Sequence, residues 1–187
     1  MSESGGGSAL LALLTKLSFV RRKVVLASGR ESDWFIDCKQ SVLTAEGHSL
    51  VGEAMLDALV RLPTAPRAVA GVELGGCPLA SAVSLLSYQR GAPLDAVYVR
   101  KTAKDHGSKR EIEGDGRLPR GTKIAVLEDV ITTGGSTIDA VSKLRAGELD
   151  VVGVVAIVDR GEGGSEALEE AGLPLVALYG RADFMGS

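Results

Sequence analysis

Residues 123–137 read KIAVLEDVITTGGST. The stretch opens on an apolar, β-branched run from Lys123 to Leu127, which is typical of a strand buried on both faces of a parallel sheet. Two acids follow, Glu128 and Asp129, and then a turn of threonines and glycines that runs into a helical pattern from Ser136 to Ala146. A buried strand, a glycine-rich turn and a helix in this order indicate a parallel α/β sheet.

The same alternation continues on both sides of this stretch. Short apolar runs predict further strands at residues 35–38, 68–72, 94–99 and 151–158. Helical spacing of apolar residues predicts helices at residues 9–20, 49–62, 78–89 and 165–171. Strands that alternate with helices predict a single α/β domain over residues 9–187, with a central, mostly parallel sheet. Residues 1–8, MSESGGGS, are expected to form a disordered tail, with Ser8 as a possible cap of the first helix.

The composition argues against several classes of protein. No apolar run approaches the ~20 residues that span a bilayer, and no signal-peptide pattern is present. We therefore expect a cytoplasmic protein without a membrane partner, in which Cys38 and Cys77 form neither a disulfide nor a zinc site. A net charge of −3 disfavours a nucleic-acid binder that works through a broad basic face.

The turn between the acids and the helix has the features of a phosphate-binding loop. Ligands of open α/β sheets bind beyond the carboxyl ends of the strands, where this turn lies. Its glycines let backbone N–H groups close around an anion, its hydroxyls donate hydrogen bonds, and the helix N-terminus adds partial positive charge. The loop lacks the lysine of an ATP-binding P-loop, and the chain lacks the dinucleotide pattern GxGxxG.

The acid pair narrows the class of ligand that the loop could bind, because carboxylates accept hydrogen bonds from neighbouring sugar hydroxyls. Two acids directly ahead of a phosphate loop therefore indicate a ribose 5-phosphate. The alternative is a plain strand-to-helix turn whose Thr and Ser residues only cap the helix. Two acids, two threonines and two glycines in this order favour the sugar-phosphate site.

A second feature is the cationic segment RKTAKDHGSKR at residues 100–110. It places five Lys or Arg side chains and one His beside a single acid, in a protein of net negative charge. Residues 100–121 also lack periodicity, which in a compact domain is typical of a functional lid or a mobile loop. A solvated charged loop is the alternative. Beside a phosphate site in the same domain, the segment is better interpreted as a lid over an anion.

The sequence VLEDVITTGGST, residues 126–137, resembles the phosphoribosyl pyrophosphate (PRPP) motif of the type I phosphoribosyltransferases. By that resemblance Glu128 and Asp129 contact the ribose hydroxyls. The loop that would hold the 5′-phosphate consists of Thr132, Thr133, Gly134, Gly135, Ser136 and Thr137. The resemblance also implies the fold of that family: a mostly parallel sheet flanked by helices, with a small N-terminal hood and a mobile catalytic loop.

The cationic segment resembles the catalytic loop of one branch of the family, the orotate phosphoribosyltransferases. The resemblance implies that Arg100, Lys101, Lys104 and His106 bind PRPP, and that the last three act in catalysis together with Asp129. Cations stabilise the negative charge that develops on the leaving pyrophosphate, and His106 can donate a proton or a hydrogen bond to it. Because the loop of this branch acts across a dimer interface, a homodimer is expected.

Fewer residues point to a binding site for the base than to the PRPP site. Arg160, after the strand predicted at 151–158, resembles the arginine that meets orotate, and Thr132 is a second candidate contact; a surface arginine is the alternative. The chain departs from many members at Ala27 and Glu73, where they have lysines. Trp34 is expected in the core or an interface rather than as a base-stacking platform.

The resemblance implies transfer of the phosphoribosyl group from PRPP to orotate, a step of pyrimidine synthesis. Mg²⁺ is expected to bind through the oxygens of the substrate and water, without dedicated protein ligands. Two alternatives stay open: a purine or uracil phosphoribosyltransferase, and a non-catalytic regulator that senses PRPP while binding nucleic acid. The regulator would need a DNA-binding module or a basic face, and neither is visible in the sequence.

Overall fold

The computed structural model describes residues 5–25, 31–101 and 111–185. Its centre is a sheet of order β10-β9-β8-β5-β6-β7, parallel throughout except for the β6–β7 pair. The strands are β5 (Ala68–Val72), β6 (Asp95–Val99), β7 (Ile112–Glu113), β8 (Lys123–Ile131), β9 (Asp150–Asp159) and β10 (Leu175–Gly180). The predicted α/β fold with a mostly parallel sheet is confirmed.

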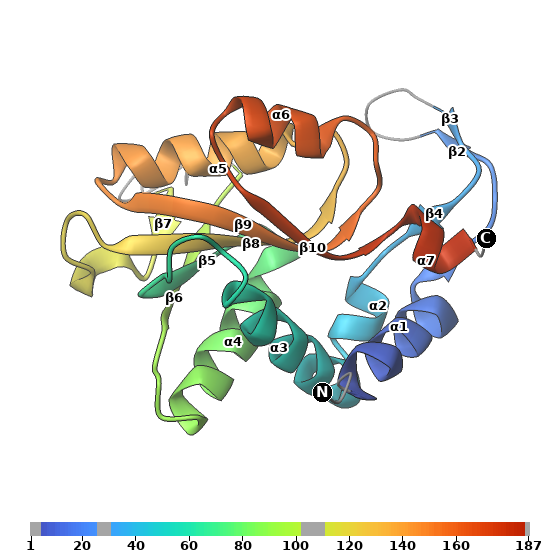
Figure 1. The fold of residues 1–187 in the computed structure, drawn as a ribbon, viewed down its shortest axis with the longest axis horizontal. Helices are drawn as coiled ribbons and strands as arrows, with labels where there is room; N and C mark the ends of the chain where they lie inside the picture. Colours follow the sequence, from blue (N-terminus) through green and yellow to red (C-terminus); the bar gives the residue numbers. More distant parts are fainter. Residues whose placement is uncertain (1–4, 26–30, 102–110, 186–187) are drawn as a thin grey trace, which may run out of the picture.

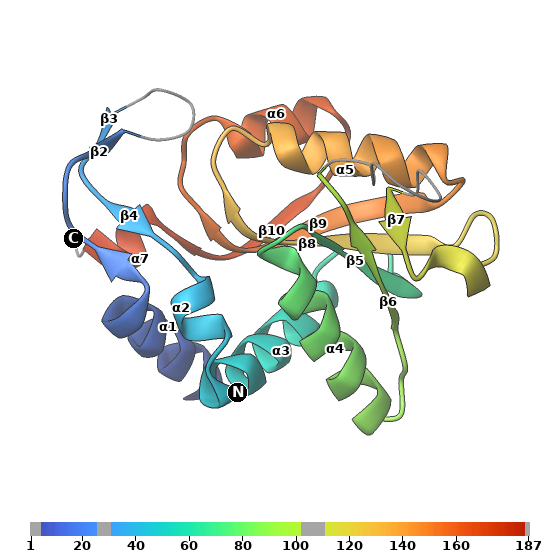
Figure 2. The ribbon, with the colours of Figure 1, turned by 180° about the vertical axis from the view of Figure 1, so that it is seen from behind.

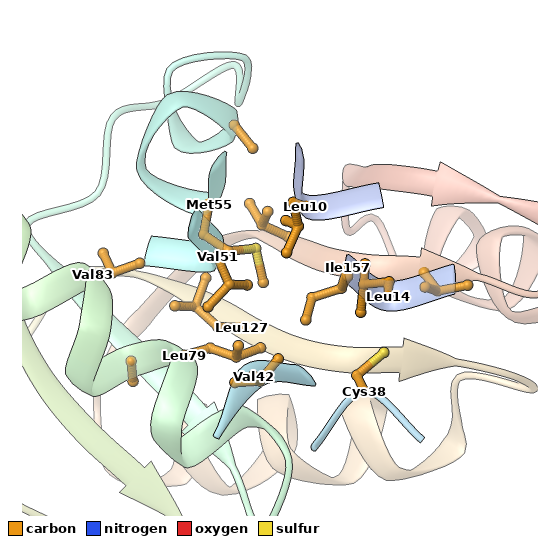
Figure 3. Packing of buried hydrophobic residues seen from close by; sticks show 14 of the residues in the cluster. Leu10, Leu14, Cys38, Val42, Val51, Met55, Leu79, Val83, Leu127 and Ile157 are labelled. Atoms are coloured by element: carbon orange, nitrogen blue, oxygen red, sulfur yellow. The ribbon is translucent and has the colours of Figure 1, made fainter. Parts of the chain in front are cut away.

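Helices cover both faces of the sheet (Figure 1). One face carries α5 (Gly135–Ala146) and α6 (Gly164–Glu170), and the other carries α3 (Ala45–Leu59) and α4 (Gly76–Gln89). Successive side chains of β8 point to opposite faces of the sheet. Val126 packs into the core beneath α5 and α6, whereas Leu127 packs into the core beneath α3 and α4, which Figure 3 shows. Burial on both faces explains why this strand has no polar alternation.

The N-terminal layer comprises residues 5–25 and 31–42; its helices lie beside α3, whereas its strands at residues 24–25 and 31–32 lie at the level of α6 (Figure 2). It consists of α1 (Gly5–Leu17), α2 (Lys39–Val42) and two antiparallel strand pairs, β1 (Phe19–Val20) with β4 (Phe35–Ile36) and β2 (Val24–Val25) with β3 (Glu31–Ser32). The closing helix α7 (Arg181–Met185) packs against this layer, where the ring of Phe184 stacks on those of Phe19 and Trp34 at 5.6 and 6.0 Å. The aromatic stack therefore ties the two ends of the described chain together.

The first helix begins earlier than predicted. α1 starts at Gly5, so that residues 5–8 are helical and Ser8 lies inside the helix instead of capping it; residues 1–4 lie outside the described part of the chain. Leu10 and Leu14 are fully buried, and the Tyr179 hydroxyl donates a hydrogen bond to the Gly7 carbonyl at 2.6 Å. Tertiary packing thus holds a segment whose own composition indicated disorder.

Other boundaries also differ from the prediction. α1 ends at Leu17, so that Phe19 and Val20, predicted as helical, form β1. β8 continues through both acids to Ile131, because Glu128 and Val130 stay paired with Ala156 and Val158 of β9. α3 begins at Ala45, where the Thr44 side chain accepts a hydrogen bond from the Gly47 N–H. The aperiodic stretch predicted at residues 100–121 contains β7 and a 3₁₀ turn, η1 (Asp115–Arg117). None of the described helices is long and apolar enough to cross a membrane.

Candidate active site

The acid pair lies near the carboxyl end of β8, in the middle of the sheet. Glu128 is buried and Asp129 half-buried. The backbone N–H of Asp129 donates to Glu128 Oε1 at 3.2 Å, and that of Val130 donates to Asp129 Oδ1 at 3.0 Å. The main chain therefore restrains both carboxylates at the edge where ligands of parallel sheets bind.

The environment of Glu128 favours its protonated form. Burial raises the pKa of the Glu128 carboxyl well above its ordinary value, and the charge of Asp129 and a hydrogen bond with its side chain act in the same direction. The hydrogen bond from the Asp129 backbone N–H and the charge of Lys101 lower the pKa. A buried carboxyl beside a second acid, at the mouth of a phosphate loop, is typical of a functional site.

The turn after β8 contains residues 132–137, which were predicted to bind the 5′-phosphate and are called the cradle below. Gly134 takes a left-handed conformation with φ of 79°, which a side chain would disfavour. The backbone N–H groups of the first three residues of α5, Gly135 to Thr137, have no acceptor inside the helix. A Cβ at Gly135 would meet nothing within 4 Å, so the space before these N–H groups is open. An anion can bind there without a lysine in the loop.

The hydroxyls of the cradle are not equivalent. Thr133 and Ser136 are exposed and Thr132 is half-buried. Thr137 instead lies on the face of α5 that packs on the sheet, together with Ala140 and other buried residues. Its hydroxyl is buried without a hydrogen-bond partner among the described residues. The predicted phosphate contact of Thr137 therefore depends on its backbone N–H.

The loop after β5 closes the site from the side of the neighbouring strand. Gly75 lies against the Asp129 carboxyl so closely that a Cβ at this position would overlap it. Glu73, in the same loop, forms hydrogen bonds with the residues at and after the end of β6. Its backbone N–H donates to the Val99 carbonyl at 2.9 Å, and its Oε2 accepts from the Lys101 N–H at 3.0 Å. The Glu73–Leu74 peptide is cis. The acid that replaces the lysine of many family members thus fixes the start of the cationic segment.

The start of the cationic segment is held by a backbone pair. The Arg100 N–H donates to the Glu111 carbonyl at 2.8 Å, and Arg100 Nη1 lies 3.4 Å from Glu113 Oε1. Lys101 is exposed. Lys104 and His106 lie outside the described residues, so their predicted roles stay predictions.

Lys143 of α5 was not anticipated from the sequence. Its ammonium donates to the carbonyls of Arg100 and Lys101 at 2.8 and 2.9 Å and lies 3.3 Å from Glu111 Oε1. It therefore joins both ends of residues 102–110 to the helix that begins at the cradle. Because these contacts span about forty positions, no local pattern reveals them.

Arg160 follows β9 directly and lies beside the cradle, since its N–H donates to the Ile131 carbonyl at 3.0 Å. It is buried, which rules out the alternative of a surface arginine. Its Nε pairs with Glu162 at 2.7 Å, and its Nη2 donates to Ser32 Oγ at 2.8 Å and to the Trp34 carbonyl at 3.1 Å. The guanidinium also lies 4.3 Å from the Trp34 ring centre. Trp34 is buried, as predicted.

A cavity of about 520 Å³ opens beside this arginine. Its wall includes Lys23, Ser32, Asp33, Trp34, Arg160 and Glu162. Charged groups of both signs and an indole line it, so the cavity suits a small, flat, anionic ligand. Ala27, the other departure from the family, lies outside the described residues.

Lys39, at the start of α2, is a second residue that sequence reasoning missed. Its ammonium lies 2.6 Å from Asp37 Oδ1 and 3.9 Å from Asp129 Oδ2. A signal was present, because Asp37 and Lys39 fall at the end of a predicted strand, where site residues of α/β proteins gather. The N-terminal layer therefore contributes a cation to the edge of the acid pair.

Comparisons with known proteins agree with this arrangement. The family model described as "Phosphoribosyl transferase domain" matches residues 45–171, which contain the acid pair, the cradle and Arg160. The orotate phosphoribosyltransferase of Sorangium cellulosum (strain So ce56) is 64% identical, over 99% of this chain and 97% of its own length.

Two solved structures of the Mycobacterium tuberculosis H37Rv orotate phosphoribosyltransferase resemble the chain. The complex with Fe(III) dicitrate has a TM-score of 0.81 and 36% identity, covering 96% of this chain and 99% of that one. The complex with PRPP has a TM-score of 0.78 and 34% identity, covering 96% and 98%. The similarity in sequence and in fold thus extends over nearly the whole chain.

Proposed function

This chain belongs to the phosphoribosyl transferase domain family, and from that premise we propose that it is an orotate phosphoribosyltransferase. It transfers the 5-phosphoribosyl group of PRPP to orotate, giving orotidine 5′-monophosphate and pyrophosphate in pyrimidine (UMP) biosynthesis. One observation carries the proposal: the ends of β8 and β9, with Ile131 opposite Asp159, bring the acid pair, the cradle and Arg160 to one edge of the sheet. This adjacency supports a donor site and an acceptor site side by side.

The donor would bind along β8 and the start of α5. Asp129 and Glu128 accept hydrogen bonds from the ribose hydroxyls, and the open N–H groups of the cradle hold the 5′-phosphate. Arg100 and Lys101, which follow the strand beside the Glu73 loop, are proposed to bind the pyrophosphate. The bond from the ribose carbon to pyrophosphate breaks while a bond to an orotate ring nitrogen forms, and these cations stabilise the charge that passes to the leaving group. Lys104 and His106 are proposed for the same step.

Orotate would occupy the cavity beside Arg160. The ligand is a flat ring with a carboxylate. Arg160 Nε and Nη2 already bond Glu162, Ser32 and Trp34, so Nη1 is the nitrogen that we propose donates to this carboxylate. In the structure Glu162 and the main chain of the N-terminal layer hold this guanidinium in place. The half-buried Thr132, which follows the Ile131 that bonds the Arg160 N–H, is proposed as a further orotate contact.

We also propose that PRPP binds together with Mg²⁺. The carboxylate of Asp129 is half-buried at the site, and such oxygens can bind the water shell that Mg²⁺ keeps. The ion supplies positive charge for the pyrophosphate. Among the described residues, no three His, Cys, Asp or Glu side chains form a group that could hold a metal.

A homodimer in the cytoplasm completes the proposal. The resemblance of residues 100–113 to a loop that acts across a dimer interface supports the dimer. The biosynthetic reaction, which uses soluble intracellular substrates, supports the location.

The test is the reaction itself. Purified protein with PRPP, Mg²⁺ and orotate should consume orotate, followed by its ultraviolet absorbance, and release one pyrophosphate for each orotate. Adenine, hypoxanthine and uracil should neither release pyrophosphate nor compete at equal concentration. Release of pyrophosphate with another base, but not with orotate, would instead identify one of the alternative phosphoribosyltransferases. PRPP binding without turnover of any base would favour the regulator.

A further inference from the structure

Two adjacent acids at a site for an anionic donor create an electrostatic problem. PRPP carries phosphates, and like charges close together disfavour binding. Among the described residues, Lys39 is the cation that forms an ion pair with this acid pair, through Asp129 Oδ2 at 3.9 Å. Its role in the site therefore needs an explanation beyond that of a surface lysine.

The position of Lys39 is fixed by its own segment. Asp37 Oδ1 accepts from the Lys39 ammonium and from its backbone N–H, at 2.6 and 3.3 Å, and Asp37 Oδ2 accepts from Gln40 Nε2 at 3.1 Å. The short helix α2 is anchored behind it by buried Ser41, whose hydroxyl bonds that of Ser18 at 2.6 Å. The ammonium is thus placed by packed main chain, although its side chain is 38% exposed.

The distance to Asp129 is informative. At 3.9 Å the ammonium is too far for a hydrogen bond but close enough for a charge interaction. Asp129 Oδ2 therefore keeps its full capacity to accept ribose hydroxyls, whereas Oδ1 already accepts from the Val130 N–H. An ammonium hydrogen-bonded to Oδ2 would use one of its acceptor positions.

We propose that Lys39 is a positioning residue for PRPP binding: held by Asp37, its ammonium offsets the charge of the acid pair and orients Asp129 toward the ribose. This inference rests on the proposed function, because it assigns the donor site to PRPP. It also makes the N-terminal layer part of the donor site, in addition to the strands and loops of the sheet.

The test is direct PRPP binding, measured by calorimetry on the full chain with Mg²⁺ and without orotate. Lys39→Met, which keeps the length and removes the charge, should weaken binding about tenfold, within the range of coupled pairs in double-mutant cycles. Lys39→Arg should restore most of the affinity. Lys16→Met, the same change at an exposed lysine of α1, is the control and should bind as the unmodified chain does.

A double-mutant cycle distinguishes an effect of Lys39 that acts through Asp129 from a general effect of its charge on PRPP binding. If Lys39 acts through Asp129, Lys39→Met should change PRPP binding less than twofold in an Asp129→Asn background. Equal losses in both backgrounds, or a Lys39→Met chain that binds like Lys16→Met, would overturn the inference and leave the proposed function intact. An unmodified chain that does not bind PRPP would overturn both. Thermal unfolding of each variant checks that the fold is kept.

Discussion

At Glu128 the requirements of PRPP binding and of folding stability are opposed. Its carboxyl is buried beside Asp129, and burial raises its pKa well above the ordinary value of about 4.3 for glutamate. In the unfolded chain the group returns to that ordinary value. Between the two pKa values the folded state binds more protons than the unfolded state, so this group lowers the stability of the fold as the pH rises through that window.

Glu128→Gln should therefore stabilise the protein and weaken donor binding. Near pH 7 the variant should unfold a few degrees higher, for a gain of about 1 kcal/mol, because no charge has to be buried. The gain should vanish near pH 4, where the carboxyl is protonated in both states. PRPP binding should fall about tenfold, since the amide puts an NH₂ group, which only donates, in place of one of the two carboxyl oxygens. Thermal unfolding across pH and calorimetry measure the two effects.

Glu169→Gln, the same change at an exposed position of α6, is the matched control and should shift neither quantity. A stability difference between the Glu128→Gln and unmodified chains that stayed constant from pH 4 to pH 8 would show that the buried charge is not its cause.

At the scale of elements, α5 connects the cradle at its first turn to the cationic segment through Lys143. The Lys143 ammonium contacts the carbonyls of Arg100 and Lys101 and the Glu111 side chain. Lys143→Met should release both ends of residues 102–110 from the helix. We expect kcat/KM for PRPP to fall about tenfold, while the free energy of unfolding falls by about 1–2 kcal/mol through the lost hydrogen bonds.

Arg145→Met, at an exposed position in the same turn of α5, serves as the control, with a change of stability within about 0.5 kcal/mol. Steady-state kinetics and denaturant unfolding compare the two variants. If both showed the same kcat/KM, the contact of Lys143 with the segment would have no part in turnover.

Elements that the sequence predicts well are those whose burial is uniform. β5 is found at the predicted residues, Ala68–Val72, because each of its side chains is buried. β10 was missed since its side chains are all half-buried at the sheet edge, and β7 exists only through its pairing with β6. Two-residue strands of this kind have no local pattern that could reveal them.

The residues of the candidate site also divide into those that the sequence indicates and those that only the fold brings together. The acid pair and cradle were predictable because their chemistry is contiguous in the chain. Arg160 was predictable as a cation at the end of a strand, although not its burial against Trp34. Lys39 had the same signal, its place at the end of a predicted strand, but its approach to Asp129 depends on the meeting of distant segments. Lys143 had no such signal, since a lysine on the polar face of a helix has no periodic signature.

At the scale of the whole molecule, the proposed dimer makes the active site a joint property of two chains. If the cationic segment of one protomer serves the cradle of its partner, a Lys101→Ala chain and an Asp129→Asn chain, each nearly inactive, should complement each other. In a mixed dimer, one of the two sites combines an intact segment with an intact acid pair. Random mixing gives half mixed dimers, so about a quarter of the unmodified activity should return.

The orotate assay on chains mixed by co-expression measures this recovery, with dimer formation followed by sedimentation. A mixture of Lys101→Ala with Lys104→Ala is the matched control, because both changes affect the same segment and no site in any dimer is complete. Recovery in the first mixture but not in the second requires that Lys101 and Asp129 of one active site come from different chains. A proven mixed dimer of the first pair that stayed inactive would place the segment over the cradle of its own chain.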